Sequence, residues 1–349
     1  GGMLTNSEGK RFMFDYVPEM YKDEFADTEE EALEWVSEIV DGKLATVRRP
    51  PELLTRDVVA KAINSERDAG RASAHGGAYL DISWREPDQV RKKLPGMYHQ
   101  FKELAAVDIT TEKMEVGPTA HYVMGGIKVH PETQETTVPR MFAAGEAATG
   151  LHGANRLGGN SLSDLIVFGK IAGENAASVA KDIDEFLTIN PAEIDDVIHE
   201  TLAPLNRKKG ENPAKVVEDL REMMQYKVGI IRTEKLLKEA LEDLNELEIR
   251  EKNTSVGDSK IYNPGWHQAL EIGAMIDVSR MCALAALHRE ESRGGHTRDD
   301  FPVPDYKYWG KMNSVITKKD VMAIEHRRYP SIDDELKQLL DIEDLHEEE

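Results

Sequence analysis

The sequence of 349 residues has a single cysteine, few aromatic residues and no long apolar run. With Cys282 alone, the chain cannot build a disulfide framework or a cysteine-ligated cluster, and it suits a reducing compartment. The longest apolar stretch, around Met281–Leu287, is far shorter than the roughly 18–20 residues that a membrane-spanning helix needs. We therefore expect a soluble protein without direct membrane insertion.

An excess of basic residues is also missing, since 44 Lys and Arg stand against 65 Asp and Glu, a net charge of −21. A nucleic-acid backbone requires a basic face, so this balance argues against nucleic-acid binding. Much of the acidic charge lies in three segments that we interpret as solvated faces: Asp23–Glu38, Glu239–Glu251 and Asp333–Glu349. Because this field repels dianions, a site for an anionic substrate would have to gather arginines and histidines locally.

The first residues lack the basic and apolar segments of a signal peptide. Gly1–Lys10 instead looks like the middle of a strand and a turn. We therefore expect the chain to be part of a longer protein, and its length is sufficient for two or three domains.

The first third of the chain mixes helices with a short strand. Thr28–Val40 and Thr55–Ala69 each begin with a threonine suited to an N-cap and continue with apolar residues at helical spacing. Gly76–Ile82 predicts a strand, and Pro87–Ala106 predicts a helix that a proline and a glycine interrupt.

The next segment predicts strands followed by a glycine-rich turn and a helix. Tyr122–Val129 and Val138–Ala144 have the pattern of strands, and Leu162–Val179 that of a buried helix. A strand, glycines and a helix in this order form the junction at which α/β proteins bind nucleotides.

Beyond Pro191 the pattern becomes helical. Apolar residues recur at three- and four-residue spacing over Ala192–Asn206, Pro213–Leu247 and Trp266–Glu291, which predicts a helical bundle. An extended stretch rich in proline and aromatic residues, Phe301–Trp309, precedes a charged tail.

The run His152–Asp164, HGANRLGGNSLSD, carries the strongest indication of a ligand site. Short and turn-forming residues surround Arg156 just before a helix begins, which places the arginine beside free backbone N–H groups. Asn160, Ser161 and Leu162 open that helix, and their N–H groups direct a partial positive charge at an anion or a cofactor. A plain tight turn is the alternative, because a glycine pair before a helix is not specific.

Three further residues are candidates, each with an ordinary alternative. Glu146 ends an apolar strand and could accept hydrogen bonds from ribose hydroxyls, or cap a helix. His121 could donate to a substrate carboxylate, or be a structural histidine. Arg56 lies in the first turn of a helix, where pairing with Asp57 or another acid is the simplest interpretation. No histidine or cysteine spacing suggests a metal site.

Taken together, these segments resemble the flavoprotein subunit of succinate dehydrogenase and fumarate reductase. The specific part of the resemblance is HYVMGG at residues 121–126 combined with HGANRLGGNSL at residues 152–162. It is strongest with the bacterial, actinobacterial-like branch. The matching stretches occur in the family's order and are Gly2–Phe12, Leu54–Ala62, Met97–Gly126, Val138–Gly173 and Glu291–Pro302.

The resemblance implies an FAD-dependent oxidoreductase that interconverts succinate and fumarate. Carried over position by position, His121 and Arg156 would bind the substrate carboxylates, and Arg56 would exchange a proton with the substrate carbon. The residues that would contact FAD are Glu146, Asn160, Ser161 and Leu162. The partners would be the iron–sulfur and membrane anchor subunits of the complex, which would place the protein in the cytoplasm, peripheral on the inner face of the cell membrane.

The fold that the resemblance implies is α+β and multidomain. Its expected parts are the remainder of a capping domain (1–118), the second segment of a Rossmann-like FAD-binding domain (119–185), a helical bundle domain (186–297) and an extended carboxy-terminal tail (298–349). The family's amino-terminal Rossmann segment, with its glycine-rich phosphate loop, is not in the sequence, nor is the histidine that carries covalently bound FAD. We therefore expect the carboxy-terminal portion of such a subunit.

Two other functions remain open from the sequence. An L-aspartate oxidase would share the FAD fold and a similar arginine, although Met124 and the pair Gly158-Gly159 favour the succinate and fumarate branch. A folded interaction module without catalysis is the second alternative, and flavin binding would distinguish it.

Overall fold

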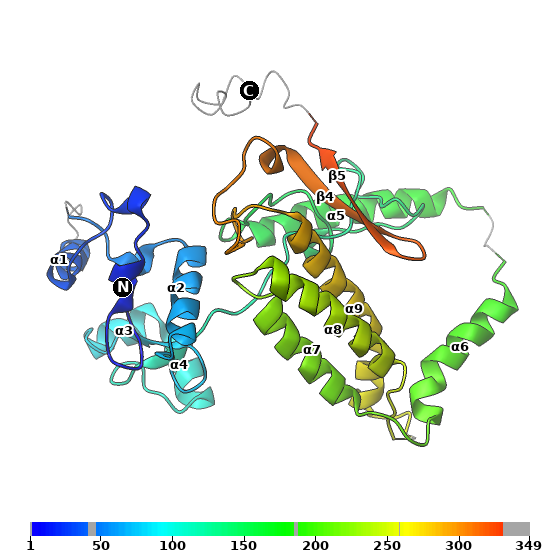
Figure 1. Cartoon of the computed structure of the whole chain (residues 1–349), viewed down its shortest axis with the longest axis horizontal. Helices are drawn as coiled ribbons and strands as arrows, with labels where there is room; N and C mark the ends of the chain where they lie inside the picture. Colours follow the sequence, from blue (N-terminus) through cyan, green and yellow to red (C-terminus); the bar gives the residue numbers. More distant parts are fainter. Residues whose placement is uncertain (1, 41–46, 185–187, 258, 331–349) are drawn as a thin grey trace. The chain divides into compact units, whose positions relative to one another are not determined.

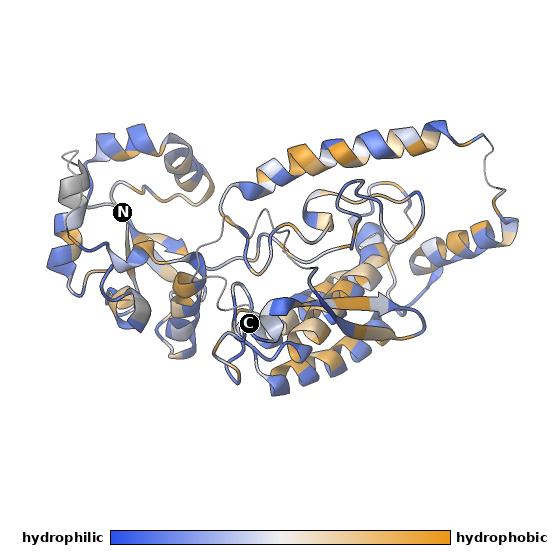
Figure 2. Ribbon diagram, turned by 90° about the horizontal axis from the view of Figure 1, so that it is seen from above, coloured by the Kyte–Doolittle hydropathy of each residue, from blue (hydrophilic) through white to orange (hydrophobic). Residues whose placement is uncertain are grey.

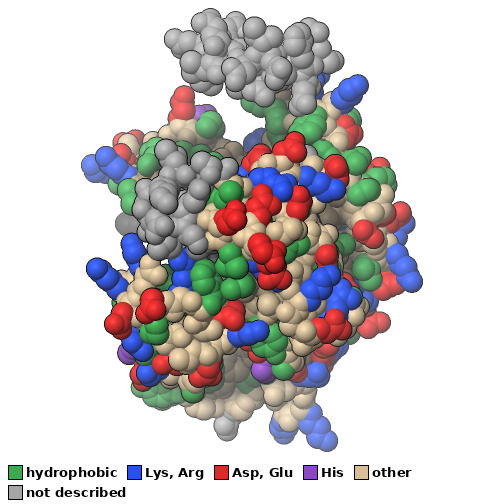
Figure 3. All heavy atoms as spheres, turned by 90° about the vertical axis from the view of Figure 1, so that its left-hand side faces the viewer, with side chains coloured by type: hydrophobic (Ala, Val, Ile, Leu, Met, Phe, Trp, Pro, Cys, Tyr) green, Lys and Arg blue, Asp and Glu red, His purple; other side chains and the backbone are tan. Residues whose placement is uncertain are grey.

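The computed structural model describes residues 2–40, 47–184, 188–257 and 259–330 (Figure 1). The chain divides into two compact units, Gly1–His121 and Tyr122–Glu349, each of which has its own core. Acidic and basic side chains are interspersed on the face shown in Figure 3, as expected for solvated surfaces. The acidic tail Asp333–Glu349 lies outside the described residues.

The first unit contains a three-stranded antiparallel sheet in the order β1-β2-β3. Phe12 and Met13 are completely buried in its core and pack with Ala62 and Ile63 of the helix beneath. The elements of this unit are β1 (Met3–Thr5), α1 (Glu29–Val40), α2 (Arg56–Asp68), β2 (Ala78–Asp81), α3 (Pro87–Lys93), α4 (Pro95–Leu104) and β3 (Met114–Val116). Short 3₁₀ turns lie at Phe12–Tyr16, Glu19–Tyr21 and Pro51–Leu53.

The second unit is built on three long helices that lie side by side, α7, α8 and α9 (Figure 1). Their shared core includes Val216, Leu237, Leu244 and Ile272, none of which has an exposed side chain. The elements of this unit are α5 (Asn160–Lys181), α6 (Pro191–Asn206), α7 (Pro213–Lys227), α8 (Glu234–Glu251), α9 (Pro264–His288), β4 (Met312–Lys318) and β5 (Met322–Arg328). Short 3₁₀ turns lie at Gly145–Ala147 (η4) and Trp309–Lys311.

The helices predicted from periodicity are present, with two corrections. The predicted helix Pro213–Leu247 is two helices, because the chain reverses at Gly229, where a Cβ atom would lie 2.3 Å from the carbonyl oxygen of Gln225. The predicted helix Leu162–Val179 forms as α5 but is not buried, since Asp164 is its only buried residue. Apolar residues along α5 therefore face outward (Figure 2).

The predicted strands Tyr122–Val129 and Val138–Ala144 are wrong. The chain there makes only isolated bridges, such as Ile127 with Ala148 and Glu135 with Phe142. A strand requires a neighbouring strand of similar length, and among the described residues these segments find single pairing positions only. In the region predicted to be an extended tail, β4 and β5 form a two-stranded antiparallel hairpin that the sequence analysis missed.

Candidate active site

Arg156 lies in the loop between η4 and α5 and is held from two directions. Its backbone N–H donates to Sδ of Met124 at 3.0 Å, and its Nη1 donates to the carbonyl oxygen of Leu157 at 3.2 Å. The guanidinium carbon lies 4.6 Å from the ring centroid of Tyr122, within the range of a cation–π interaction. The face of the guanidinium is thus occupied by a ring, and a planar anion would approach its edge.

Tyr122 is itself fixed by a buried polar pair. Its hydroxyl donates to Oδ2 of Asp164 at 3.2 Å and lies 2.9 Å from Nε2 of His152. The side chains of His152 and Asp164 are both 6% exposed, and Nε2 and Oδ2 are 3.3 Å apart. Burial, together with the charge of Asp164, raises the pKa of Tyr122, so the phenol stays protonated at neutral pH.

These three residues were not identified from the sequence as functional. Asp164 is the one buried residue of α5, so the helix begins with a carboxylate directed inward while its apolar residues face outward. Two features of the sequence could have pointed to them. Tyr122 directly follows His121, and His152 and Asp164 are the first and last residues of the run that contains Arg156. A buried carboxylate without a cationic side chain needs such hydrogen-bond donors.

Glu146 lies in η4 and contacts the same short segment. Its Oε1 accepts a hydrogen bond from the backbone N–H of Val123 at 2.9 Å. The residue is exposed, and its Oε2 has no hydrogen bond within the part of the chain that the structure describes. One oxygen therefore fixes the carboxylate and the other can accept from a ligand hydroxyl, whereas Glu146 caps no helix.

Three consecutive residues thus join the parts of the site in this unit. Tyr122 contacts the Arg156 side chain, Val123 contacts Glu146, and Met124 contacts the Arg156 backbone. Gly126 allows this segment to approach η4, since a Cβ atom there would lie 2.6 Å from the carbonyl oxygen of Ala147. Close backbone packing therefore favours glycine at position 126.

The amino-terminus of α5 differs in detail from the prediction. Gly159 is the N-cap with φ of +87°, a left-handed conformation that favours glycine. The N–H groups of Asn160 and Leu162 donate to the carbonyls of Leu157 and Gly159, at 3.3 and 3.1 Å, so they are not free as expected. The N–H of Ser161 has no such bond among the described residues, and it is the donor that remains for a ligand.

The two other predicted site residues belong to the first unit. His121 is exposed, in the loop after β3. Arg56 is the first residue of α2 and is exposed, and it makes no hydrogen bond or ion pair with any described residue, so the simple pairing with Asp57 does not form. The helix dipole disfavours a cation at this end, and Thr55 provides no side-chain cap. Stability therefore gives no reason for an arginine at this position.

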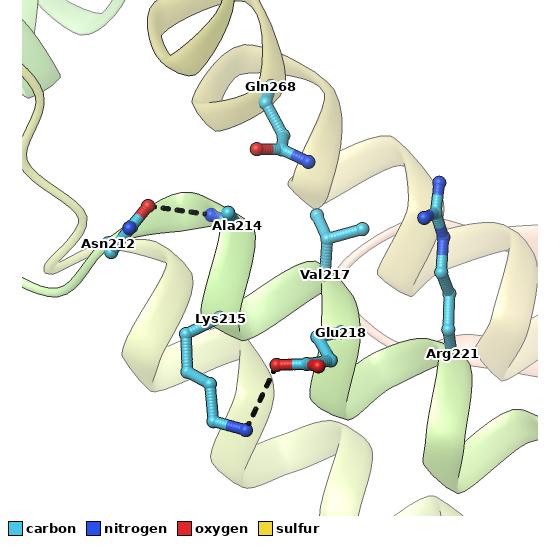
Figure 4. Close-up of a pocket in the computed structure, with 7 residues that line it drawn as sticks. All are labelled: Asn212, Ala214, Lys215, Val217, Glu218, Arg221 and Gln268. Carbon is cyan, nitrogen blue, oxygen red and sulfur yellow. Dashed lines mark hydrogen bonds and ion pairs between the residues drawn. The ribbon is translucent and has the colours of Figure 1, made fainter.

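A pocket among the described residues, at the start of α7, is lined by none of the predicted site residues (Figure 4). It is lined by Asn212, Ala214, Lys215, Val217, Glu218, Arg221 and Gln268. Lys215 pairs there with Glu218 at 3.2 Å, so its charge is compensated. Within the described residues no group of His, Cys, Asp and Glu could hold a metal ion, and no helix has the length and apolar character to cross a membrane.

Comparison with protein families matches both units. Residues 1–162 match the family model for the FAD binding domain, and residues 217–338 match the model for the carboxy-terminal part of the fumarate reductase flavoprotein. A relative from Methanothermobacter marburgensis, which is part of a fumarate reductase (CoM/CoB), is 36% identical over 314 residues, which are 88% of this chain and 50% of the relative. The chain spans about half the length of the curated relatives it matches.

Solved structures match in the same way. Sdh1 of Mycobacterium smegmatis superimposes with a TM-score of 0.81 and 42% identity, over 100% of this chain and 54% of that one. Quinol fumarate reductase of E. coli superimposes with a TM-score of 0.78 and 30% identity, over 94% of this chain and 54% of that one. The chain is therefore similar to these proteins in sequence as well as in fold.

Proposed function

The chain belongs to the flavoprotein family of succinate dehydrogenases and fumarate reductases, whose cofactor is FAD, and we propose that this protein interconverts succinate and fumarate. The observation that carries the proposal is the fixed position of Arg156, whose guanidinium lies against the ring of Tyr122 and whose backbone N–H donates to the sulfur of Met124. In a chain of net charge −21, a fixed arginine just before the amino-terminus of α5 is suited to an anionic substrate.

Arg156 and His121 are the proposed carboxylate ligands. A guanidinium presents N–H donors in a planar fork that matches a carboxylate, and lysine offers no such geometry. The Tyr122 ring covers one face of Arg156, so the edge of the fork is the part offered to the substrate. His121 is exposed and can donate one ring N–H to the other carboxylate.

Arg56 is the proposed proton donor and acceptor. When bound, FAD supplies the site that takes or gives the hydride at one substrate carbon. In the fumarate direction, Arg56 gives its proton to the neighbouring carbon as the double bond becomes single, and it must then regain a proton from solvent or a relay. Its position supports this role, because the guanidinium is exposed at the first residue of α2 and makes no hydrogen bond or ion pair with any described residue.

The residues proposed to hold FAD are Glu146, Asn160, Ser161 and Leu162. The arrangement of two of them fits the group: Oε2 of the exposed Glu146 can accept from ribose hydroxyls, and the N–H of Ser161, at the start of α5, makes no hydrogen bond among the described residues. Gly159 has no atom within 4 Å of the position of a Cβ, so a flat ring system can approach the backbone there.

The partners and the location are part of the same proposal. One relative is by name the flavoprotein subunit of an 8-methylmenaquinol:fumarate reductase, and one similar structure is a quinol–fumarate reductase with menaquinol. By analogy, electrons would leave this chain through iron–sulfur and membrane anchor subunits, on the cytoplasmic face of the membrane. The acidic net charge of this chain is compatible with docking onto a basic face of such a partner.

The first test is the flavin content of the purified chain, read by visible absorbance after FAD is added and excess is removed. Bound flavin that succinate bleaches and fumarate restores supports the proposal. In the FAD-loaded protein, Arg56→Lys should lose turnover and keep dicarboxylate affinity, and Arg156→Ala should lose affinity by about 2–5 kcal/mol. Unchanged succinate binding by Arg156→Ala would refute the role of Arg156.

A further inference from the structure

The turn Arg293–His296, which follows α9, contacts Ala154 of the Arg156 loop and the side chain of Met124. The N–H of Gly295 donates to the carbonyl oxygen of Ala154 at 3.0 Å. Gly294 has φ of +60°, and a Cβ atom there would lie 2.3 Å from that same oxygen. A Cβ atom at Gly295 would lie 3.0 Å from Cε of Met124, the residue whose sulfur accepts the Arg156 N–H. At Gly294 only glycine fits without displacing the loop, and at Gly295 a larger residue would push against the Met124 side chain.

His296 closes this turn and ties it to the helical bundle. Its backbone N–H and carbonyl both bond to Arg293, at 3.1 and 2.9 Å. Its Nδ1 lies 2.9 Å from Nη1 of Arg232, and its Nε2 lies 3.0 Å from the carbonyl oxygen of Arg289. Arginine can only donate and a carbonyl can only accept, so Nδ1 accepts and Nε2 carries the proton. The imidazole is therefore neutral, and burial lowers the pKa of His296 to about 4.

Arg232 lies between α7 and α8, and both its side chain and its backbone make hydrogen bonds. Its Nε donates to the carbonyl of Val228 at 2.9 Å. Its backbone N–H donates to Thr297 at 3.2 Å, and its carbonyl accepts from Asp299 at 2.9 Å. No acidic side chain pairs with Arg232 among the described residues, and desolvation lowers its pKa. The side chain of Arg232 therefore connects two segments by hydrogen bonds, the end of α7 at Val228 and the turn at His296.

We propose that His296 and Arg232 are positioning residues for Arg156: they hold the Gly294-Gly295 turn against Ala154 and Met124, and so set where the Arg156 guanidinium stands. The path is continuous, from Arg232 through His296 to the glycine turn and then to the two contacts that flank Arg156. That the guanidinium receives a substrate carboxylate rests on the function proposed above, whereas the positioning itself does not.

Hydrogen exchange of the full 349-residue chain, read by mass spectrometry, tests the positioning without any ligand. His296→Ala removes both bonds, and we expect exchange in the peptides around Ala154–Arg156 to become roughly tenfold faster, with α8 unchanged. His296→Asn places an amide oxygen near the Nδ1 position and keeps the Arg232 bond, so its exchange should return most of the way to that of the original chain. His199→Ala, an exposed histidine on α6, is the matched control and should change nothing.

Three results would overturn the proposal. Exchange that rises only in the turn at residues 292–298 would show that the Arg156 loop does not depend on it. Exchange that rises equally in α8 would show a general loss of stability. Equal exchange in the alanine and asparagine variants would show that the Arg232 bond is not what holds the turn.

A second measurement links the positioning to the substrate. In the FAD-loaded protein, His296→Ala should raise the Kd for succinate roughly tenfold and leave flavin binding unchanged, and His296→Asn should restore most of it. Faster exchange around Arg156 with an unchanged Kd would contradict the carboxylate role of Arg156 and leave the positioning in place. Unchanged exchange would contradict the positioning, whatever the Kd.

Discussion

Acid should destabilise the second unit through His296, by an amount that can be worked out. The folded unit holds the pKa of this residue at about 4, against 6.5 for an ordinary histidine, so the unfolded chain binds the proton more tightly. The contribution of His296 to the free energy of unfolding is therefore constant well above pH 6.5 and falls as the pH drops from 6.5 towards 4. Between pH 7 and pH 5 this linkage amounts to about 2 kcal/mol of unfolding free energy.

The assay is urea denaturation followed by far-ultraviolet circular dichroism, for the original chain and for His296→Asn, at several pH values between about 7 and 5. Other groups titrate in this range, such as His75, whose pKa the Glu115 carboxylate raises, and they contribute equally to both proteins. The difference between the two pH profiles therefore isolates His296. We expect the original chain to lose about 2 kcal/mol more than the variant on going from pH 7 to pH 5. Parallel profiles would refute the neutral, buried state of His296.

Three further predictions concern other parts of the chain. Tyr122→Phe removes a donor from the buried Asp164 carboxylate and should cost about 1–3 kcal/mol in thermal unfolding, and a stability equal to that of the original chain would contradict the hydrogen bond. Glu66→Gln should destabilise the first unit by about 2–3 kcal/mol in urea, since a carboxylate 2% exposed loses its charge while its partners, the Arg71 guanidinium, the Tyr16 hydroxyl and the Asn6 amide, remain. Gly294→Ala should lower the free energy of unfolding by at least about 2 kcal/mol in thermal denaturation, because φ is positive and the carbonyl of Ala154 blocks the Cβ. Its control is Gly169→Ala on α5, where no atom lies within 4 Å of the Cβ position. That change should be neutral or stabilising by up to about 1 kcal/mol in the same assay.

The helices were predictable because their signals are local. Apolar spacing predicted α2 (Arg56–Asp68) and α6 (Pro191–Asn206) nearly to the residue, although Thr55, at the N-cap position of α2 as expected, makes no side-chain capping hydrogen bond. The strand prediction at Tyr122–Val129 failed because pairing depends on what lies beside a segment, which the pattern along the chain does not contain. The burial predicted for α5 failed for a similar reason, since an apolar helix carries no information about whether another surface covers it.

Residue type and motif singled out Arg156 and Glu146, and their roles stay predictions. The residues that hold them were not predictable, because their roles come from contacts across long stretches of sequence. Tyr122 meets Asp164 over 42 residues, and Arg232 meets His296 over 64. In the sequence, His296 is an ordinary polar residue after a glycine turn, and its role becomes visible only when both of its ring nitrogens are placed. Arg56 and His121 remain predictions from resemblance.

The outward-facing apolar residues of α5 have a consequence for how tightly a ligand can bind. The helix buries only Asp164, and Leu162, Leu165 and Ile166 are more than half exposed, so little free energy holds α5 to its unit. Detachment of α5 would withdraw Asp164 from Tyr122 and release the support of Arg156. The apparent dissociation constant of the proposed dicarboxylate would then be the intrinsic one divided by the fraction of molecules in which α5 is attached. Affinity at Arg156 would thus report how firmly the first two turns of α5 are held.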